Sequence, residues 1–252
     1  MKRTIFLYSF FILLLSCDRS EIDKLIENPS ESKIENQDDS SGITQSEVKD
    51  SLIYKKDSIN DKIDIPELLL NTSVTVMNYR GNINLGLGSG AFISPNLVVT
   101  NYHVIEGGNK WEVTRFSDKK RFKAKVKKID EAHDICILEL IDGSVNQYLS
   151  INDKYPKIGT DIMVAGSPIG LDGTITKGNV SNIQRKEPYD YELLQISAPI
   201  SPGNSGGPVV NQKGEIVGIS VGTIVGQGIQ NINFAVPARY IMFLLRGITD
   251  AQ

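Results

Sequence analysis

The chain has 252 residues and a formal net charge of −3 at pH 7; 40% of its residues are hydrophobic and 23% are charged. A chain of this length can bury a substantial core, and so small a net charge gives no electrostatic reason to expect a nucleic-acid partner. The sequence holds two cysteines, Cys17 and Cys136, with no CxxC motif and no His/Cys cluster. We therefore expect neither a metal ion nor a cofactor, and we interpret Cys136, which lies in an apolar run, as a small core residue.

The first sixteen residues have the pattern of a cleaved export signal. A basic start precedes an apolar stretch, residues 4–15, that is too short to span a bilayer. The stretch ends in Leu-Leu-Ser-Cys17, which resembles a bacterial lipoprotein signal box. This resemblance implies removal of residues 1–16 and a lipid on Cys17; the alternative is an ordinary secretory signal with a chance cysteine. We expect a bacterial cell-envelope protein, anchored to a membrane and facing the periplasm or the exterior.

Residues 17–65 are expected to form a flexible, lipid-anchored tether. They are rich in Asp, Glu, Ser, Asn, Lys and Gln and carry few aromatic residues, so they cannot bury enough apolar surface to order themselves. Scattered Ile and Leu residues from Ile43 to Ile65 leave a short docked helix as an alternative. The folded domain is expected over residues 66–250.

The folded domain shows mostly short strand patterns separated by Gly, Asp-Gly, Lys-Gly or Asn-rich turns. This spacing is typical of closed antiparallel β structure. Ile241, Leu244 and Leu245 recur at helical spacing, so a helix is expected over residues 238–247. The periodicity therefore predicts an all-β fold with a C-terminal helix. The expected strands are residues 74–79, 89–93, 97–100, 111–116, 121–128, 135–140, 161–166, 174–181, 193–196, 207–210, 216–220 and 233–237.

One of these strands is strongly basic. Residues 119–128 alternate basic and apolar side chains after Arg121. We interpret the segment as a half-exposed strand, with a basic docking patch as the alternative.

A serine set among glycines is the first candidate for chemistry. Ser205 lies in Pro-Gly-Asn-Ser-Gly-Gly-Pro, residues 202–208. Three glycines and two prolines in seven residues exclude a core strand, although they also suit an ordinary turn. The glycines leave the hydroxyl uncovered and let backbone N–H groups turn toward a developing oxyanion. A nucleophile here needs a base and an acid from elsewhere in the chain.

The two histidines of the chain differ in context. His103 follows an apolar, β-branched run, whereas His133 lies in a charged turn. Asp134 leads directly into the apolar strand 135–140, so its carboxylate can lie at the edge of the core; Asp130 is the competing acid and is expected to be solvated. The order His103, Asp134, Ser205 is the one found in chymotrypsin-type enzymes.

Three motifs together resemble the catalytic motifs of HtrA/Deg-type trypsin-like serine proteases. They are Thr-Asn-Tyr-His-Val at 100–104, Asp-Ile-Cys-Ile-Leu at 134–138 and Gly-Asn-Ser-Gly-Gly-Pro at 203–208. The resemblance covers roughly residues 66–247 and implies a trypsin-like (chymotrypsin) fold of two six-stranded antiparallel β-barrels with the site between them. Few residues follow Gly247, so a PDZ domain is not expected. Supporting matches lie at residues 88–93, 166–171, 176–181 and 233–237.

The resemblance implies a serine endopeptidase that acts on polypeptide substrates. Ser205 would attack the peptide carbonyl, His103 would carry the proton, and Asp134 would orient His103. The backbone N–H groups of Gly203 and Ser205 would form the oxyanion hole, and Ser220 would help to orient Asp134. The alternative is a catalytically silent, lipid-anchored binding or holdase module on the same fold.

The resemblance also predicts how a substrate binds. The peptide would pair along Ser220, Val221 and Gly222 as an added strand. Ile200 and Phe234 would line the P1 pocket, where no carboxylate is evident, so small-to-medium aliphatic P1 residues are expected.

Activation is expected to follow loop rearrangement rather than N-terminal clipping. Asn204 stands where trypsin-type zymogens carry the Asp that pairs with a new N-terminus, and it has no charge to pair. The loops 200–203 and 221–231 contain Gly or Pro and could reorder. Relatives often form homo-trimers, but the sequence identifies no contact for such an oligomer.

Overall fold

The computed structural model describes residues 63–186, 189–223 and 232–249. These ranges belong to one compact unit, Ile59–Gln252. The predicted signal peptide, Cys17 and almost all of the predicted tether lie outside the described residues. None of the helices within these ranges is both long and apolar enough to cross a membrane.

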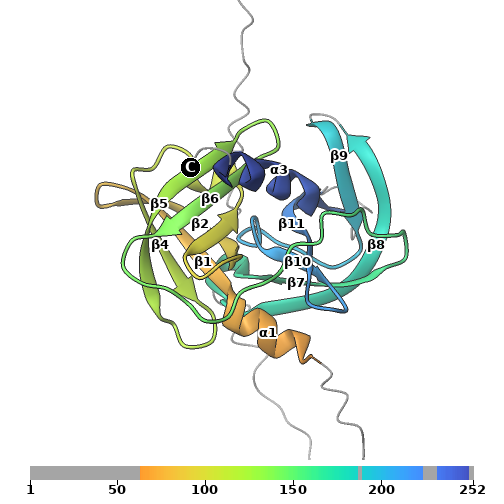
Figure 1. Cartoon of the computed structure of the whole chain (residues 1–252), viewed down its shortest axis with the longest axis horizontal. Helices are drawn as coiled ribbons and strands as arrows, with labels where there is room; N and C mark the ends of the chain where they lie inside the picture. Colours follow the sequence, from red (N-terminus) through yellow and green to blue (C-terminus); the bar gives the residue numbers. More distant parts are fainter. Residues whose placement is uncertain (1–62, 187–188, 224–231, 250–252) are drawn as a thin grey trace, which may run out of the picture. The chain divides into compact units, whose positions relative to one another are not determined.

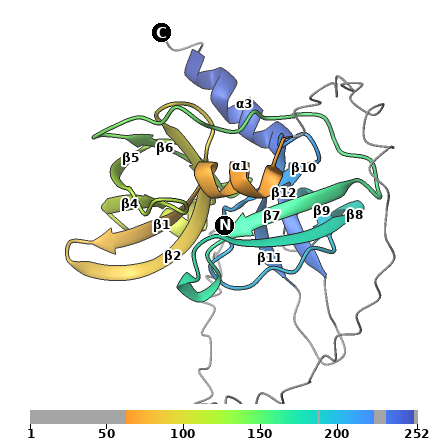
Figure 2. The same ribbon diagram turned by 90° about the horizontal axis from the view of Figure 1, so that it is seen from below.

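Two closed antiparallel barrels of six strands each make up the domain (Figure 1). The barrels lie side by side, with one short helix at their junction (Figure 2) and a C-terminal helix after the last strand. This architecture confirms the predicted fold class. The first barrel contains β1 (Ser73–Arg80), β2 (Ile83–Phe92), β3 (Leu97–Thr100), β4 (Lys110–Arg115), β5 (Arg121–Asp130) and β6 (Ile135–Leu140), closed in the order β1-β2-β3-β6-β5-β4. The second contains β7 (Asp161–Gly166), β8 (Thr174–Lys186), β9 (Tyr189–Ile196), β10 (Pro208–Asn211), β11 (Ile216–Thr223) and β12 (Asn233–Pro237), closed in the order β10-β11-β12-β9-β8-β7. The helices are α1 (Ile65–Thr72), α2 (Tyr102–Ile105) and α3 (Ala238–Thr249), with a 3-10 turn η2 (Pro168–Gly170).

Each barrel encloses its own apolar core. Phe92 and Phe122 pack edge to face in the first barrel, with ring centroids 5.9 Å apart. A further cluster joins α1 and α3 to both barrels and includes Leu69 of α1 and Ile241 of α3. Cys136 lies buried in β6, where desolvation raises the pKa of its thiol to about 12, so it is a core residue and not a reactive thiol at neutral pH.

All twelve expected strands are present, and several are longer than their apolar patterns. The strand β2 begins at Ile83 and β8 continues to Lys186, whereas the patterns marked only residues 89–93 and 174–181. The added part of β2 is exposed, and its backbone pairs with β1 away from the core. Hydrophobic alternation therefore marks the buried part of each strand, while hairpin pairing extends it.

The basic segment is the half-exposed strand that its pattern predicts. In β5 the buried residues Phe122 and Ala124 alternate with exposed charged neighbours. Lys125 and Lys127 both pair with Glu139 of β6. Part of the positive charge is therefore compensated on the barrel surface, which argues against a docking patch.

The helix α1 was not predicted over residues 65–72; it begins at Ile65, the last residue of the segment for which a short docked helix was the alternative. The Asp64 carboxylate caps it by accepting from the backbone N–H of Glu67 at 3.1 Å, and Pro66 occupies the first turn. Ile65 and Leu69 are buried against the domain. The folded domain therefore already includes Ile65.

Leu69→Ala is expected to lower the free energy of unfolding by about 2–5 kcal/mol, because a fully buried side chain is lost and a cavity remains. Urea unfolding would measure this. Glu67→Ala, on the exposed face of the same helix, is the control and should change it little. Equal effects for the two variants would show that α1 is not anchored by Leu69.

Candidate active site

The barrel topology brings His103 and Asp134 together. His103 lies in α2 directly after β3, and Asp134 directly precedes β6. Because β3 and β6 pair with Thr100 opposite Cys136, the end of one strand lies beside the start of the other. Ser205 is in the turn that leads into β10 of the second barrel.

Two contacts join His103 to Asp134. The carboxylate oxygen Oδ2 lies 2.7 Å from His103 Nδ1, and Oδ1 accepts from the His103 backbone N–H at 2.9 Å. This arrangement orients the ring and favours the tautomer with the proton on Nδ1, which leaves Nε2 free to accept a proton. The His103 side chain is 44% exposed and that of Asp134 only 16%, so the base is accessible while its orienting acid is covered.

The backbone of Asp134 adopts a conformation that is uncommon for a residue other than glycine. Its φ is +55°, in the left-handed region. The fully buried Asn101 secures it by donating from Nδ2 to the Asp134 carbonyl oxygen at 2.9 Å. Such an arrangement is maintained by surrounding structure and is common at functional sites.

The competing acid, Asp130, contacts His133 and not His103. Its Oδ2 lies 2.7 Å from His133 Nδ1, and the His133 ring stacks on Tyr240 at 4.1 Å between centroids. The prediction that Asp130 is merely solvated was wrong, because its side chain is paired and only 23% exposed. This pairing leaves Asp134 as the acid that contacts His103.

The turn around Ser205 depends on glycines. Gly203 has a φ of +102°, and a Cβ atom there would lie 2.3 Å from the Ser167 carbonyl oxygen. Among the described residues, the backbone N–H groups of Gly203 and Ser205 have no hydrogen-bond acceptor. Two free N–H groups beside a serine can bind a developing oxyanion. In the same described ranges, no hydrogen bond joins Ser205 Oγ to His103.

Ser89 connects this turn to the first barrel, a role that its sequence motif did not predict. Its N–H donates to the Ser205 carbonyl oxygen at 2.7 Å, and its Oγ donates to the Gly203 carbonyl oxygen at 2.7 Å. The same Oγ accepts from the Ser167 N–H at 2.9 Å. The only signal was the Gly-Ser-Gly run at 88–90, which gives no indication of these partners.

Ser89→Ala is expected to lower the free energy of unfolding by about 1–3 kcal/mol, because the half-buried Gly203 carbonyl and the buried Ser167 N–H lose their partner. Denaturant unfolding would measure the loss. Ser73→Ala is a matched control, since Ser73 is also fully buried but its Oγ has no hydrogen-bond partner among the described residues. A comparable loss in both variants would contradict a bridging role for Ser89.

Ser220 has a different partner from the one predicted. Its Oγ donates to the Asn204 carbonyl oxygen at 2.5 Å, so its one hydroxyl proton is not directed at Asp134. Ser220 therefore supports the turn that carries Ser205. A second hydrogen bond joins the same two segments: the Gly206 N–H donates to the Ser220 carbonyl oxygen at 2.8 Å.

The other predicted substrate-binding residues lie along and near the β11–β12 pair. Val221 and Phe234 are buried and Gly222 and Ile200 are half-buried; within the described ranges, nothing lies within 4 Å of a Cβ placed on Gly222. The pairing of β10 with β11 ends at Ile219. Among the residues that the structure describes, the edge of β11 beyond Ser220 has no strand partner on that side, as an added strand requires. Residues 224–231 of the predicted switching loop lie outside the described ranges.

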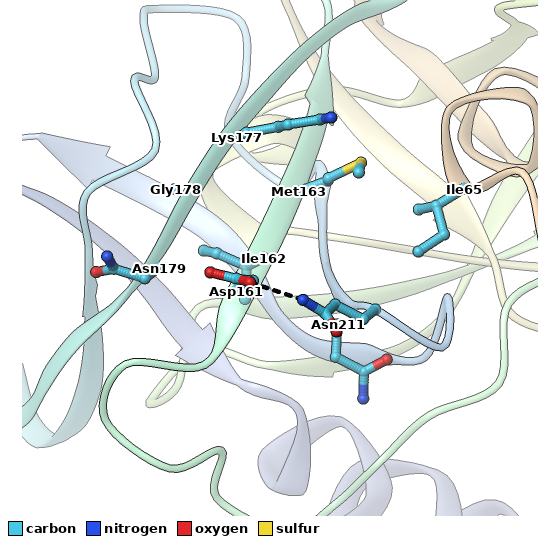
Figure 3. A pocket seen from close by; sticks show the side chains of 9 residues that line it. Ile65, Asp161, Ile162, Met163, Lys177, Gly178, Asn179 and Asn211 are labelled. Carbon is cyan, nitrogen blue, oxygen red and sulfur yellow. Dashed lines mark hydrogen bonds between the residues drawn. The ribbon is translucent and has the colours of Figure 1, made fainter.

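A cavity of about 460 Å³ lies away from these residues, on β7 and β8 and near α1 (Figure 3). Its polar contact joins Gln212 Nε2 to Asp161 Oδ2 at 2.6 Å. It includes none of the predicted catalytic residues. The cavity gives no reason to move the candidate chemistry away from Ser205.

Comparison with known proteins agrees with this assignment of the fold. Residues 88–219 match the trypsin-like peptidase domain family, and the chain belongs to that family. A probable periplasmic DegP-like serine endoprotease of Pseudomonas savastanoi pv. phaseolicola is 39% identical over 156 residues, covering 60% of this chain and 32% of the relative. The Do-like serine protease HtrB of Bacillus subtilis is 32% identical over 56% of this chain and 33% of its own length. The chain thus spans about a third of these curated relatives.

Solved structures give the same result. The crystal structure of a serine endoprotease from Yersinia pestis matches with a TM-score of 0.63 and 28% identity, covering 73% of this chain and 64% of that one. The resemblance to HtrA/DegP-like proteases inferred from the motifs is therefore confirmed at the level of sequence and fold.

Proposed function

We propose that the protein is a serine endopeptidase with His103, Asp134 and Ser205 as its catalytic triad. The observation that carries this proposal is the two-point contact between Asp134 and His103, on the same domain as a glycine-framed serine with free N–H groups beside it. Asp130 makes the same two contacts with His133, but that ring is less exposed and stacks on Tyr240, so the glycine-framed serine and the exposed ring of His103 distinguish the proposed triad.

The mechanism follows from these groups. Ser205 Oγ attacks the peptide carbonyl while His103 Nε2 takes the hydroxyl proton, and His103 then gives that proton to the leaving amine. Asp134 stabilises the imidazolium that forms in between. The N–H groups of Gly203 and Ser205 hold the oxyanion, and water attacks the acyl-enzyme to restore the serine.

Substrates are proposed to be envelope or extracellular polypeptides with small-to-medium aliphatic P1 residues. The edge of β11, unpaired among the described residues, supports binding of an extended chain, and Ile200 and Phe234, which pack in two different apolar clusters, are proposed to line the P1 pocket. A peptide-library digest tests the preference: cleavage after Lys or Arg faster than after Val or Leu would overturn it.

The proposal includes a lipid anchor on Cys17 at the cell envelope. It is supported by the Leu-Leu-Ser-Cys17 sequence and by a relative described as periplasmic. Metabolic labelling of the protein with a fatty acid tests the anchor, and we expect the label to be lost in Cys17→Ser. Labelling retained in that variant would overturn it.

A silent binding or holdase module is the second candidate. It is favoured by one observation, the absence of a hydrogen bond between Ser205 Oγ and His103 among the described residues. Catalytic contacts of this kind often form only with substrate bound, so the geometry is also compatible with a resting protease.

Fluorophosphonate labelling of the full chain separates the two functions. We expect labelling of the wild type and its loss in Ser205→Ala and His103→Ala. Absent labelling, even with an aliphatic peptide or an unfolded protein added, would identify a binding module.

A further inference from the structure

The turn that carries Gly203 rests on a loop of the second barrel. This loop, residues 167–173, joins β7 to β8 and is called here the β7–β8 loop. A Cβ on Gly203 would lie 2.3 Å from the Ser167 carbonyl oxygen, and the Ile169 N–H donates to the Pro202 carbonyl oxygen at 3.0 Å. The conformation of Pro202–Gly203 therefore depends on where this loop lies.

The β7–β8 loop is in turn tied to the first barrel through Asp172. Its Oδ1 accepts from Ser167 Oγ at 2.6 Å and also from Thr75 Oγ1 of β1. Its Oδ2 pairs with Lys119 Nζ at 3.2 Å. Thr75 and Lys119 belong to the first barrel and Ser167 to the second, so one carboxylate connects the two barrels.

The three contacts are made to an ionised group. Burial by itself raises the pKa of Asp172, but hydrogen bonds from Ser167, Thr75 and Lys119 outweigh it and hold the pKa below its ordinary value. Lys119 is 57% exposed, so the ion pair contributes less than the two hydroxyl contacts. Ser167 and Thr75 are both largely buried, which makes the loss of their common acceptor costly.

We propose that Asp172 is a positioning residue for the oxyanion site. It fixes the β7–β8 loop between the barrels, and the loop fixes Gly203. The inference rests on the proposed endopeptidase function, since it assigns to Asp172 the task of keeping the Gly203 N–H group ready for the oxyanion. Nothing in the sequence motif around residue 172 indicates this role, because its partner Thr75 is 97 residues away.

The test compares Asp172→Ala, Asp172→Asn and Glu112→Gln in the full chain. Glu112 is a matched control: it lines the same cavity as Asp172, its side chain is equally exposed at 24%, and it pairs with Lys110 instead of the loop. We expect Asp172→Ala to lower kcat by about tenfold or more with KM within about twofold, since displaced oxyanion donors affect the transition state more than the bound substrate. Asp172→Asn keeps one acceptor oxygen, so its kcat should lie between those of the wild type and Asp172→Ala. The kcat of Glu112→Gln should match that of the wild type.

Hydrogen exchange at the Ile169 amide gives a readout that needs no activity. It should be faster in Asp172→Ala and unchanged in Glu112→Gln, because the Ile169 bond to Pro202 is the link between the loop and the turn. Unchanged exchange in Asp172→Ala overturns the inference whether or not the wild type is active. Faster exchange with unchanged kcat also overturns it. Faster exchange in a chain whose wild type neither labels nor turns over instead rejects the proposed function.

Discussion

Asp134→Asn is expected to lower kcat by about four orders of magnitude without unfolding the protein. The Asn side-chain oxygen can still accept from the His103 backbone N–H, but its NH₂ group then faces His103 Nδ1. That nitrogen becomes an acceptor and the ring proton moves to Nε2, where it blocks proton transfer from Ser205. Steady-state kinetics on a peptide substrate, beside thermal unfolding, would measure the effect.

Asp130→Asn is the matched control for this prediction. Asp130 contacts His133 through the same atoms and at the same 2.7 Å as Asp134 contacts His103. We expect a change in kcat of less than about threefold, because His133 stacks on Tyr240 and has no place in the proposed mechanism. A loss in Asp130→Asn equal to that in Asp134→Asn would mean that the charge of the region matters, not the orientation of His103.

The second large effect is expected for Gly203→Ala, with kcat reduced by about 10²–10³ through loss of an oxyanion donor. A methyl group at Gly203 would lie 2.3 Å from the Ser167 carbonyl oxygen, so the turn or the β7–β8 loop must move. The N–H of Gly203 moves with the turn. Activity and the free energy of unfolding should therefore both fall.

Gly159→Ala separates the backbone effect from the clash. Gly159 also has a left-handed φ, +86°, but no atom of the described residues lies within 4 Å of its Cβ position. We expect a loss of about 1 kcal/mol in stability from the unfavourable φ and no change in kcat. If Gly203→Ala behaves like Gly159→Ala in kinetics and in denaturant unfolding, the close packing on Ser167 is not required for activity.

Most of the fold was predictable because its signals are local. Alternation of apolar residues marks the buried part of each strand, and Gly- and Asn-containing turns mark the strand ends. The helix α1 was not predicted because the polar residues before it resemble the tether; its signals were Asp64 and Pro66, a capping residue followed by a proline at the helix start. The ends of β2 and β8 were missed because hairpin pairing, not burial, keeps those residues extended.

The candidate site also has residues that local sequence predicts and contacts that it does not. His103, Asp134 and Ser205 could be predicted from their residue types, their order in the chain and the motifs within a few residues of each one. The contact of Ser220 Oγ with the Asn204 carbonyl and the bridge from Ser89 to Gly203 could not be predicted in this way, and the Asp130–His133 pair was not predicted although its residues are only three positions apart. The bridge from Ser89 to Gly203 joins residues 114 positions apart, and no local pattern specifies which carbonyl a buried hydroxyl will meet after two barrels have packed together.

The amino-acid sequence alone was therefore sufficient for the all-β class, the family resemblance and the identity of the proposed nucleophile, base and acid, because each depends on short-range pattern. Barrel closure and packing were needed to show which acid contacts which histidine, and that Ser89 and Asp172 support the turn around Ser205. These contacts cross between the barrels or between distant strands, and their partners come within hydrogen-bonding distance only in the folded domain.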